Sequence, residues 1–332
     1  MSALTERTVR VNAVHNQFMR GCEGMGRNIQ YQFMNAIDQS FDGGGHDKHS
    51  DKHTGKQLDT VYSYGERSNL MDLSSQVSKF IKENYPDVKK VLDIKGEMIQ
   101  DFLNSKATTC NKETLGQYAS RIHKLEHVIN KTYKGNITWH SDLITPVANT
   151  GTNKTRDIAM NRKDYSSILN RAYVMGSKSM SVVAIELSGR FALRVSETCK
   201  LQPRDIDFDK MRLHVHESKG GRSRDIEISP EDIDFLKRTI DGKQQDKRIV
   251  AIKEDSVNKY LTRSQEALNI RSRYRDAKTG VHSIRKMVAQ EQYDKHRRNG
   301  LSKKEALNKV SEYLGHGKNR TETMKQYILN IY

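Results

Sequence analysis

The sequence predicts a mainly helical protein with one small β-sheet, an α+β fold. Apolar residues recur at three- and four-residue steps over most of the chain, which is the spacing of residues on one helix face. Only 4 of the 332 residues are proline and 30% are charged, a composition that favours helices. One short stretch instead alternates apolar and polar residues around a Gly-Gly pair, which is typical of a β-hairpin. A chain of this length can form two domains with separate cores.

Residues 1–55 are expected to form an N-terminal extension that ends in a linker. The stretch NIQYQFMNAIDQSF has a helix-like pattern, and GGGHDKHSDKHTG, residues 43–55, combines glycines and charges with no apolar side chain. His46, His49 and His53 alternate with aspartates there, so a metal site is an alternative to a linker. We expect the linker, because nothing nearby would supply the supporting contacts that metal ligands normally have.

Residues 56–150 are predicted to form a domain of three helices. The first covers 69–85, where apolar residues mark one face and Pro86 disfavours helix for the residue before it. The second covers 88–107 and the third 112–133.

The outward face of the third helix carries Lys112, Arg121, Lys124, Lys131 and Lys134. Such a basic face is most often simply solvated, and contact with DNA is the alternative. Residues 135–156 are expected to be a polar connection between the domains, in which the only tryptophan, Trp139, packs at a domain edge.

Residues 151–332 are predicted to form the second domain. Helical patterns continue to about residue 200, and the stretch MRLHVHESKGGRSRDIEIS follows. Apolar residues alternate on both sides of its Gly-Gly pair, so two strands joined by a turn are expected, with Leu213 and Val215 on one and Ile226 and Ile228 on the other. After Pro230 the pattern is again helical.

The charge of the chain favours a polyanionic partner. Lys+Arg total 57 against 41 Asp+Glu, a net charge of +16, and phosphate contacts supply most non-specific affinity for double-stranded DNA. On charge alone, a basic protein without such a partner and attraction to an anionic membrane are the alternatives.

A membrane protein is not expected, because no stretch has the roughly 20 apolar residues of a span and MSALTERTVR has no signal-peptide core. Cys22, Cys110 and Cys199 lie far apart, without a disulfide framework or metal-ligand spacing. We therefore expect a cytoplasmic protein.

Six residues of the second domain could together cleave a phosphodiester. Guanidinium groups bind phosphate oxygens, lysine and histidine transfer protons, and tyrosine can act as a nucleophile. Five of the six alone also have an ordinary interpretation: Arg194 as a surface ion pair, Lys219 as a turn residue, His282 and Arg285 as a chance pair on a basic helix, and His316 as part of a helix cap. The six residues are Arg194, Lys219, His282, Arg285, His316 and Tyr327.

The order of the surrounding sequences is more specific than any one of them. ALRVSE, SKGGRSR, HSIR, LGHG and QYI follow one another as the motifs of the tyrosine recombinase/integrase family do, and the chain resembles that family over about residues 178–329. The helical pattern of 57–134 is similar to the family's core-type DNA-binding domain (SAM-like). The resemblance implies a helical core-binding domain followed by a catalytic domain, forming a C-shaped clamp on DNA.

The resemblance also implies a role for each of the six residues. Arg194, Arg285 and His316 would stabilise the scissile phosphate, while Lys219 would protonate the leaving 5′-oxygen and His282 would assist proton transfer. Tyr327 would form a 3′-phosphotyrosyl bond, with no metal, ATP or other cofactor. It lies eleven residues after His316, two more than is common in the family, and Tyr313 and Tyr332 fit the pattern less well.

Further residues are expected to support the site or to contact DNA. Glu197 would orient the site rather than react. The expected DNA contacts are Arg121, Lys124, Lys131, Arg222 and Arg224.

The function implied is site-specific recombination, with integration of a bacterial mobile element as the favoured context. Its partners would be recombination sites in nucleoid DNA, further copies of the chain in a synapsed homotetramer, and accessory DNA-bending proteins. A type IB topoisomerase and a catalytically silent DNA-binding regulator are the alternatives. No Walker motif and no clustered acidic residues resembling a two-metal nuclease occur in the sequence.

Overall fold

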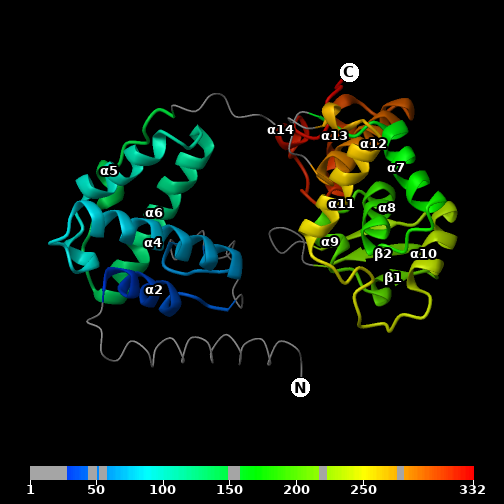
Figure 1. Cartoon of the computed structure of the whole chain (residues 1–332). Coiled ribbons are helices and arrows are strands. Elements are labelled where there is room, and N and C mark those ends of the chain that lie inside the picture. Colours follow the sequence, from blue (N-terminus) through cyan, green and yellow to red (C-terminus); the bar gives the residue numbers. More distant parts are fainter. Residues whose placement is uncertain (1–27, 44–50, 52–57, 149–157, 217–222, 275–279) are drawn as a thin grey trace. The chain divides into compact units, whose positions relative to one another are not determined.

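The computed structural model describes residues 28–43, 51, 58–148, 158–216, 223–274 and 280–332, and the chain divides into two compact units, Met1–Asn153 and Lys154–Tyr332 (Figure 1). Each unit has its own hydrophobic core. The described residues are mainly helical and contain one three-stranded sheet, so the predicted fold class is confirmed. None of the helices in these ranges combines the length and the apolar character that crossing a membrane requires.

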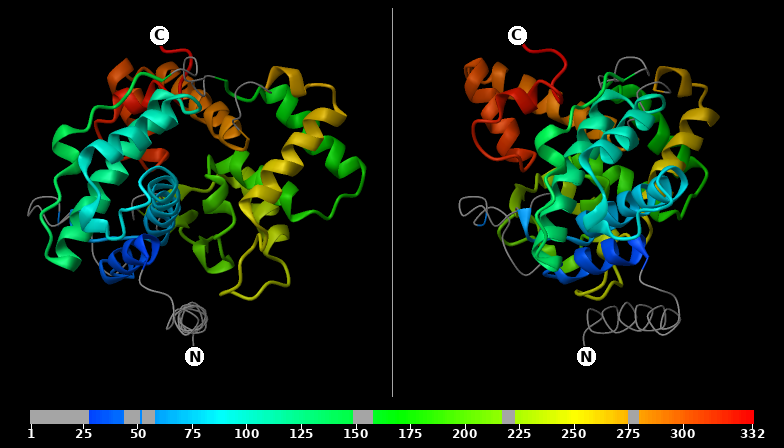
Figure 2. Two further views of the ribbon diagram at one scale, coloured as in Figure 1. Left: turned by 60° about the vertical axis from the view of Figure 1, so that its left-hand side comes forward. Right: turned by 90° about the vertical axis from the view of Figure 1, so that its left-hand side faces the viewer.

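The first unit is built from α-helices with short 3₁₀ helices between them. Its α2 packs against α4 and α6, and α5 also contacts both of these helices (Figure 2). The described elements are α2 (Ile29–Gln39), α4 (Tyr64–Asn84), η2 (Val91–Asp93), α5 (Gly96–Ala107), α6 (Lys112–Tyr133) and η3 (Trp139–Asp142).

The three predicted helices of this unit are present, but the second, α5, begins at Gly96 instead of residue 88, after the short η2. Helix α6 has the predicted bounds, and the side chain of Asn111 caps it by accepting from the Thr114 amide at 2.9 Å. Helix α4 starts earlier than predicted because Ser63 caps it, its hydroxyl accepting from the Glu66 amide at 3.1 Å. The helix ends at Asn84, two residues before Pro86.

The predicted boundary near residue 55 does not separate an extension from the first unit. Phe33, Ala36 and Ile37 of α2 are fully buried in the same core as α4 and α6. The backbone also joins the two sides of the glycine- and histidine-rich segment, since the Val61 amide donates to the Ser40 carbonyl at 2.7 Å. Glycines and charges therefore occur here inside a unit, where composition indicated a linker between units.

Trp139 belongs to the core of the first unit rather than to its edge. The indole is buried, its Nε1–H donates to the Ile94 carbonyl at 2.6 Å, and its ring lies 6.4 Å from the Phe33 ring. The η3 helix that carries it packs on α5 and α6. The predicted connection over 135–156 is thus too long, because its first part packs into the core.

The second unit surrounds the central helix α8, which packs against both α11 and α12. Its helices are α7 (Arg162–Val174), α8 (Met180–Phe191), α9 (Val195–Thr198), η4 (Pro203–Asp205), η5 (Pro230–Asp232), α10 (Ile233–Ile240), α11 (Glu254–Ala267), η6 (Arg271–Arg273), α12 (His282–Arg298), α13 (Lys303–Tyr313) and α14 (Thr321–Met324).

The predicted hairpin forms the larger part of the sheet. Strands β2 (Arg212–Val215) and β3 (Arg224–Glu227) are antiparallel, with Leu213 opposite Ile226. Both of these side chains face the core, as the alternation predicted. A third strand, β1 (Ile206–Asp207), pairs with β2 and was not predicted, since two residues are too short to show a pattern.

We predict that Phe33→Ala lowers the free energy of unfolding of the full chain by about 3–5 kcal/mol, because it leaves a cavity in the core that α2 shares with α4 and α6. Urea denaturation followed by circular dichroism measures this loss. Gln30→Ala, at an exposed position of the same helix, is the matched control and should be near neutral. Equal stabilities of the two variants would contradict the placement of α2 in the core.

Candidate active site

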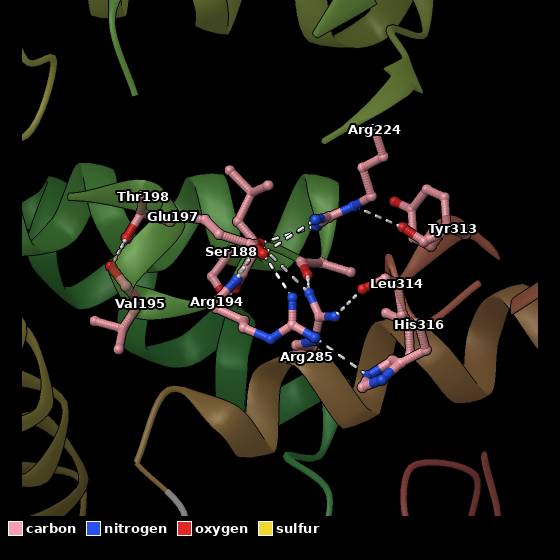
Figure 3. Close-up of polar contacts among 12 residues, drawn as sticks. Ser188, Arg194, Val195, Glu197, Thr198, Arg224, Arg285, Tyr313, Leu314 and His316 are labelled. Carbon is pink, nitrogen blue, oxygen red and sulfur yellow. Dashed lines mark hydrogen bonds and ion pairs between the residues drawn. The ribbon is translucent and has the colours of Figure 1, made fainter. Parts of the chain in front are cut away.

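The carboxylate of Glu197 lies buried among three arginines (Figure 3). Arg194 Nη1 donates to its Oε1 at 2.6 Å, and the Arg194 amide donates to its Oε2 at 2.8 Å. Arg224 binds both carboxylate oxygens, at 3.0 and 2.9 Å, and Arg285 Nη1 lies 3.6 Å from Oε2. We call these four residues the Glu197 cluster. Because it combines three guanidinium groups with one carboxylate, the cluster has an excess of positive charge.

Local structure places Arg194 and Glu197 side by side. Helix α8 ends at Phe191, and Ala192 adopts a left-handed conformation (φ 50°) that turns the chain toward α9. Arg194 is the N-cap of α9, and Glu197, three residues later, binds the N-cap amide as in a capping box. Glu197 therefore fixes both the start of α9 and the guanidinium of Arg194.

The Arg224 side chain is 7% exposed and belongs to this cluster, at a residue that the sequence predicted as a DNA contact. Besides Glu197, its Nε donates to the Tyr313 carbonyl at 3.0 Å. The strand pattern contained the signal: residues two apart in a strand share a face, and Arg224 precedes the core residue Ile226 by two.

Arg285 is fixed at the centre of the second unit. Its side chain is 0% exposed, and its terminal nitrogens donate to the carbonyls of Ala192 and Leu314. Burial, together with the nearby Arg194 charge, lowers the pKa of Arg285 to about 10, which still leaves it charged at neutral pH. The sequence predicted a phosphate contact but did not indicate these two backbone anchors.

The Leu314-Gly315-His316 segment is both a helix cap and part of the site. Gly315 has φ 74° directly after the C-cap of α13, and the His316 amide donates to the Ser311 carbonyl at 2.9 Å, closing the cap. The cap directs the His316 ring to Arg194, with Nε2 3.2 Å from Nη2. Because a guanidinium only donates, Nε2 is the acceptor and the ring proton is on Nδ1.

The neutral form of His316 is strongly favoured. Burial lowers the pKa of His316 to about 4, and the charges of Arg194 and Arg285 act in the same direction. At neutral pH the imidazole is therefore uncharged and can donate a hydrogen bond from Nδ1.

Tyr327 lies beside both predicted histidines. Its ring centroid is 5.0 Å from that of His282 and 5.1 Å from that of His316, and the Arg285 Cζ atom lies 5.7 Å from it. The residue is 7% exposed. The unusually long interval after His316, which contains α14, therefore still brings Tyr327 to the other predicted residues.

The other two candidate tyrosines fit less well. Burial raises the pKa of Tyr313 to about 12, which disfavours the phenolate that a nucleophile needs. Tyr332 is half exposed, and its ring lies 5.7 Å from that of Tyr293.

A family model described as phage integrase family matches residues 159–330, which is more than half of the chain. The chain belongs to the phage integrase family. It is a tyrosine-type site-specific recombinase, and the matched region corresponds to the second unit.

Solved structures of other tyrosine recombinases share the fold of this chain. XerH bound to its difH substrate in a pre-cleavage complex has a TM-score of 0.59 and 15% identity, covering 90% of both chains. A lambda integrase dimer bound to a COC′ core site has a TM-score of 0.54 and 18% identity, covering 96% of this chain and 87% of that one. The Tn1549 transposon integrase in complex with transposon right end DNA has a TM-score of 0.52 and 14% identity, covering 89% of this chain and 94% of that one. No curated protein sequence matches the chain.

Several predicted residues lie outside the described ranges. These are Lys219 and Arg222, His46, His49 and His53, and Cys22. Cys110 and Cys199 are described and are free thiols.

In the first unit, Lys124 is buried, whereas the sequence predicted it on the outward face of α6 among the DNA contacts. The residue is 6% exposed, and its Nζ donates to the Thr60 carbonyl at 2.5 Å above the Tyr62 ring. A lysine stem can cross apolar surface to reach such an acceptor. Arg121 is half-buried, and Lys131 is exposed and donates to the Asp59 carbonyl at 3.1 Å.

We predict that Glu197→Gln abolishes DNA cleavage and lowers stability by about 3–5 kcal/mol, because three arginines lose their only shared anion. Cleavage is measured on a nicked DNA substrate, and stability by urea denaturation. Glu186→Gln is the matched control, since it breaks the buried ion pair with Arg190 elsewhere in the same unit. The control should be less stable than the wild type, but its folded fraction should still cleave DNA. If Glu197→Gln cleaves DNA as fast as the control, Glu197 does not belong to the active site.

His316 should make the folded state sensitive to acid. Between pH 6.5, the ordinary imidazole pKa, and about pH 4, the unfolded chain binds a proton at this residue that the folded chain does not. The free energy of unfolding that the neutral His316 contributes above pH 6.5 is therefore lost as the pH falls toward 4. We predict a shallower fall in melting temperature between pH 6.5 and 4 for His316→Gln than for the wild type.

Histidine NMR resonances test the cause directly. The resonance that is missing from His316→Gln should stay in its neutral position down to about pH 5 in the wild type. A midpoint near 6.5 for that resonance would refute the proposed neutral imidazole.

Proposed function

We propose that this recombinase cleaves and rejoins DNA through a 3′-phosphotyrosyl intermediate at Tyr327. The observation that carries the proposal is the position of the Tyr327 ring, in contact range of His282, His316 and Arg285. A nucleophile, proton-transfer groups and cationic anchors in one place are what metal-free phosphodiester cleavage needs.

In the cleavage step, the Tyr327 oxygen bonds to the scissile phosphorus as the bond from phosphorus to the 5′-oxygen breaks. His282 takes the tyrosine proton, and Lys219 supplies the proton that the leaving 5′-oxygen needs. The step conserves the bond energy in the covalent intermediate, so neither ATP nor a metal ion is required. Attack by a 5′-hydroxyl of a partner strand reverses it and completes the exchange.

The Glu197 cluster supports stabilisation of the transition state. Arg194 and Arg285 would bind the non-bridging oxygens, and the neutral His316 would donate from Nδ1. Glu197 holds the two guanidinium groups before DNA arrives, which reduces the reorganisation that the reaction would otherwise cost. Because Arg285 is fully buried beside Tyr327, contact with phosphate requires a shift of the groups that cover it, and attack by Tyr327 would itself supply such a movement.

The wider reaction is site-specific recombination of double-stranded DNA. A net charge of +16 favours this partner, and Arg121 and Lys131 remain candidates for backbone contacts. Lambda integrase has been solved as a tetramer bound to a Holliday junction, and we infer that this chain likewise acts as a synapsed homotetramer, with accessory DNA-bending proteins. Integration of a mobile element into bacterial nucleoid DNA is the proposed setting.

We predict that a nicked suicide substrate yields a covalent protein–DNA adduct with the wild type, detected by denaturing gel with EDTA present. Tyr327→Phe should abolish the adduct, because the nucleophilic oxygen is removed while the ring remains. Arg194→Ala should reduce it by about 100-fold or more, the usual cost of losing one group that stabilises the transition state.

Tyr313→Phe and Tyr332→Phe are the matched controls, and both should retain the adduct. An adduct that survives Tyr327→Phe but disappears in either control would move the nucleophile there. Site-specific DNA binding without any adduct would support the silent regulator instead, and relaxation of supercoiled DNA by a monomer would support a topoisomerase.

A further inference from the structure

A group of side chains of the types that bind metal ions lies in the first unit, whereas the candidate active site belongs to the second. His123, Glu126 and His127 are spaced three and four residues apart on α6, which places them on one helix face. One ligand atom from each lies within 4.8 Å of the others. His140 from η3 stacks on His123, with the ring centroids 3.7 Å apart, and the His123 and His127 rings are 4.9 Å apart.

Glu126 is a buried carboxylate held by a backbone amide. It is 8% exposed, and its Oε2 accepts from the His140 amide at 2.7 Å. Within the described ranges it forms no ion pair with a lysine or arginine, unlike the Glu197 carboxylate. Burying a carboxylate without a compensating charge is costly, and a bound divalent cation would offset that cost.

A second contact orients one of these histidine rings, as carboxylates commonly do for the histidine ligands of metal ions. His127 Nδ1 lies 3.1 Å from Asp59 Oδ1, so the carboxylate holds the ring and leaves Nε2 free to bind a metal. Asp59, α6 and η3 are separate segments of the chain that meet at this point.

We propose that His123, Glu126, His127 and His140 bind one Zn²⁺ ion with a structural role. Three imidazoles and one carboxylate suit Zn²⁺, whereas Ca²⁺ and Mg²⁺ prefer oxygen ligands alone. Ligands of a tetrahedral zinc ion are roughly 3.4 Å apart, so side-chain movements of about 1 Å would bring the ligand atoms of His123, Glu126 and His127 together. The His140 ring, which stacks on His123, would turn to direct a ring nitrogen at the same ion. The ion would fasten η3, and with it the buried Trp139, to α6.

This site is independent of the proposed recombination chemistry, which uses no metal. Zn²⁺ binding to the folded chain should raise its melting temperature, and the rise should grow with the logarithm of free Zn²⁺ once this exceeds the Kd. Cleavage in the presence of EDTA and binding of Zn²⁺ can therefore fail or succeed separately.

The test uses the untagged full-length protein, treated with EDTA and dialysed, and titrated with Zn²⁺ by calorimetry and with Co²⁺ by visible absorption. We expect one equivalent to bind, with the intense visible bands of a tetrahedral Co²⁺ site. His123→Gln/His127→Gln should lose at least about 100-fold in affinity, since two ligands are removed. Its metal-free melting temperature, compared with that of the metal-free wild type, shows whether the variant is folded.

Two further variants make the outcome decisive. His46→Gln/His49→Gln/His53→Gln should bind Zn²⁺ as the wild type does, and loss of binding in this variant would overturn the proposal. Glu126→Gln keeps an acceptor for the His140 amide but removes the buried charge, so the metal-free protein should be at least as stable while Zn²⁺ binding weakens about 10-fold or more. Unchanged Zn²⁺ affinity in His123→Gln/His127→Gln would also overturn it.

Discussion

The ion pairs between Glu197 and its three arginines are the interaction on which the second unit depends most. The turn after α8, the strand β3 and the helix α12 each contribute one arginine to this carboxylate. Buried charges of one sign are tolerated only when a partner of the opposite sign is close and well oriented. Glu197 therefore couples the position of the sheet to that of the helices, and a substitution at any of the four residues alters the electrostatic environment of the other three.

The same cluster determines the chemistry of its neighbours. Its excess positive charge, with burial, lowers the pKa of His316 and holds the imidazole neutral, while Arg285 remains charged because its ordinary pKa is so high. A neutral hydrogen-bond donor beside two fixed cations is suited to an anion that gains charge in a transition state. These groups are oriented by carboxylate, backbone carbonyls and a helix cap rather than by the substrate.

The first unit shows how composition can mislead about domain limits. Glycines and charges after Phe41 indicated a linker, yet α2 on its other side contributes Phe33 and Ile37 to the shared core. Trp139 likewise lies in a polar-looking stretch and packs against Phe33. A short stretch of sequence does not reveal such contacts, because the residues that form them, such as Phe33 and Trp139, are about one hundred positions apart in the chain.

The sequence alone determined the helix-rich fold, the bounds of α6, the β2–β3 pairing and the motifs of a tyrosine recombinase. Periodic apolar residues and motif order are properties of the linear chain and need no partner to be recognised. Tertiary structure decided the rest: the burial of the Arg224 and Lys124 side chains, the two carbonyls that hold Arg285, and the approach of His140 to His123 and Glu126. A charged residue is predicted to face solvent by default. Whether it is buried depends on an oxygen or a carboxylate brought to it by a distant segment, and only the folded chain specifies that approach.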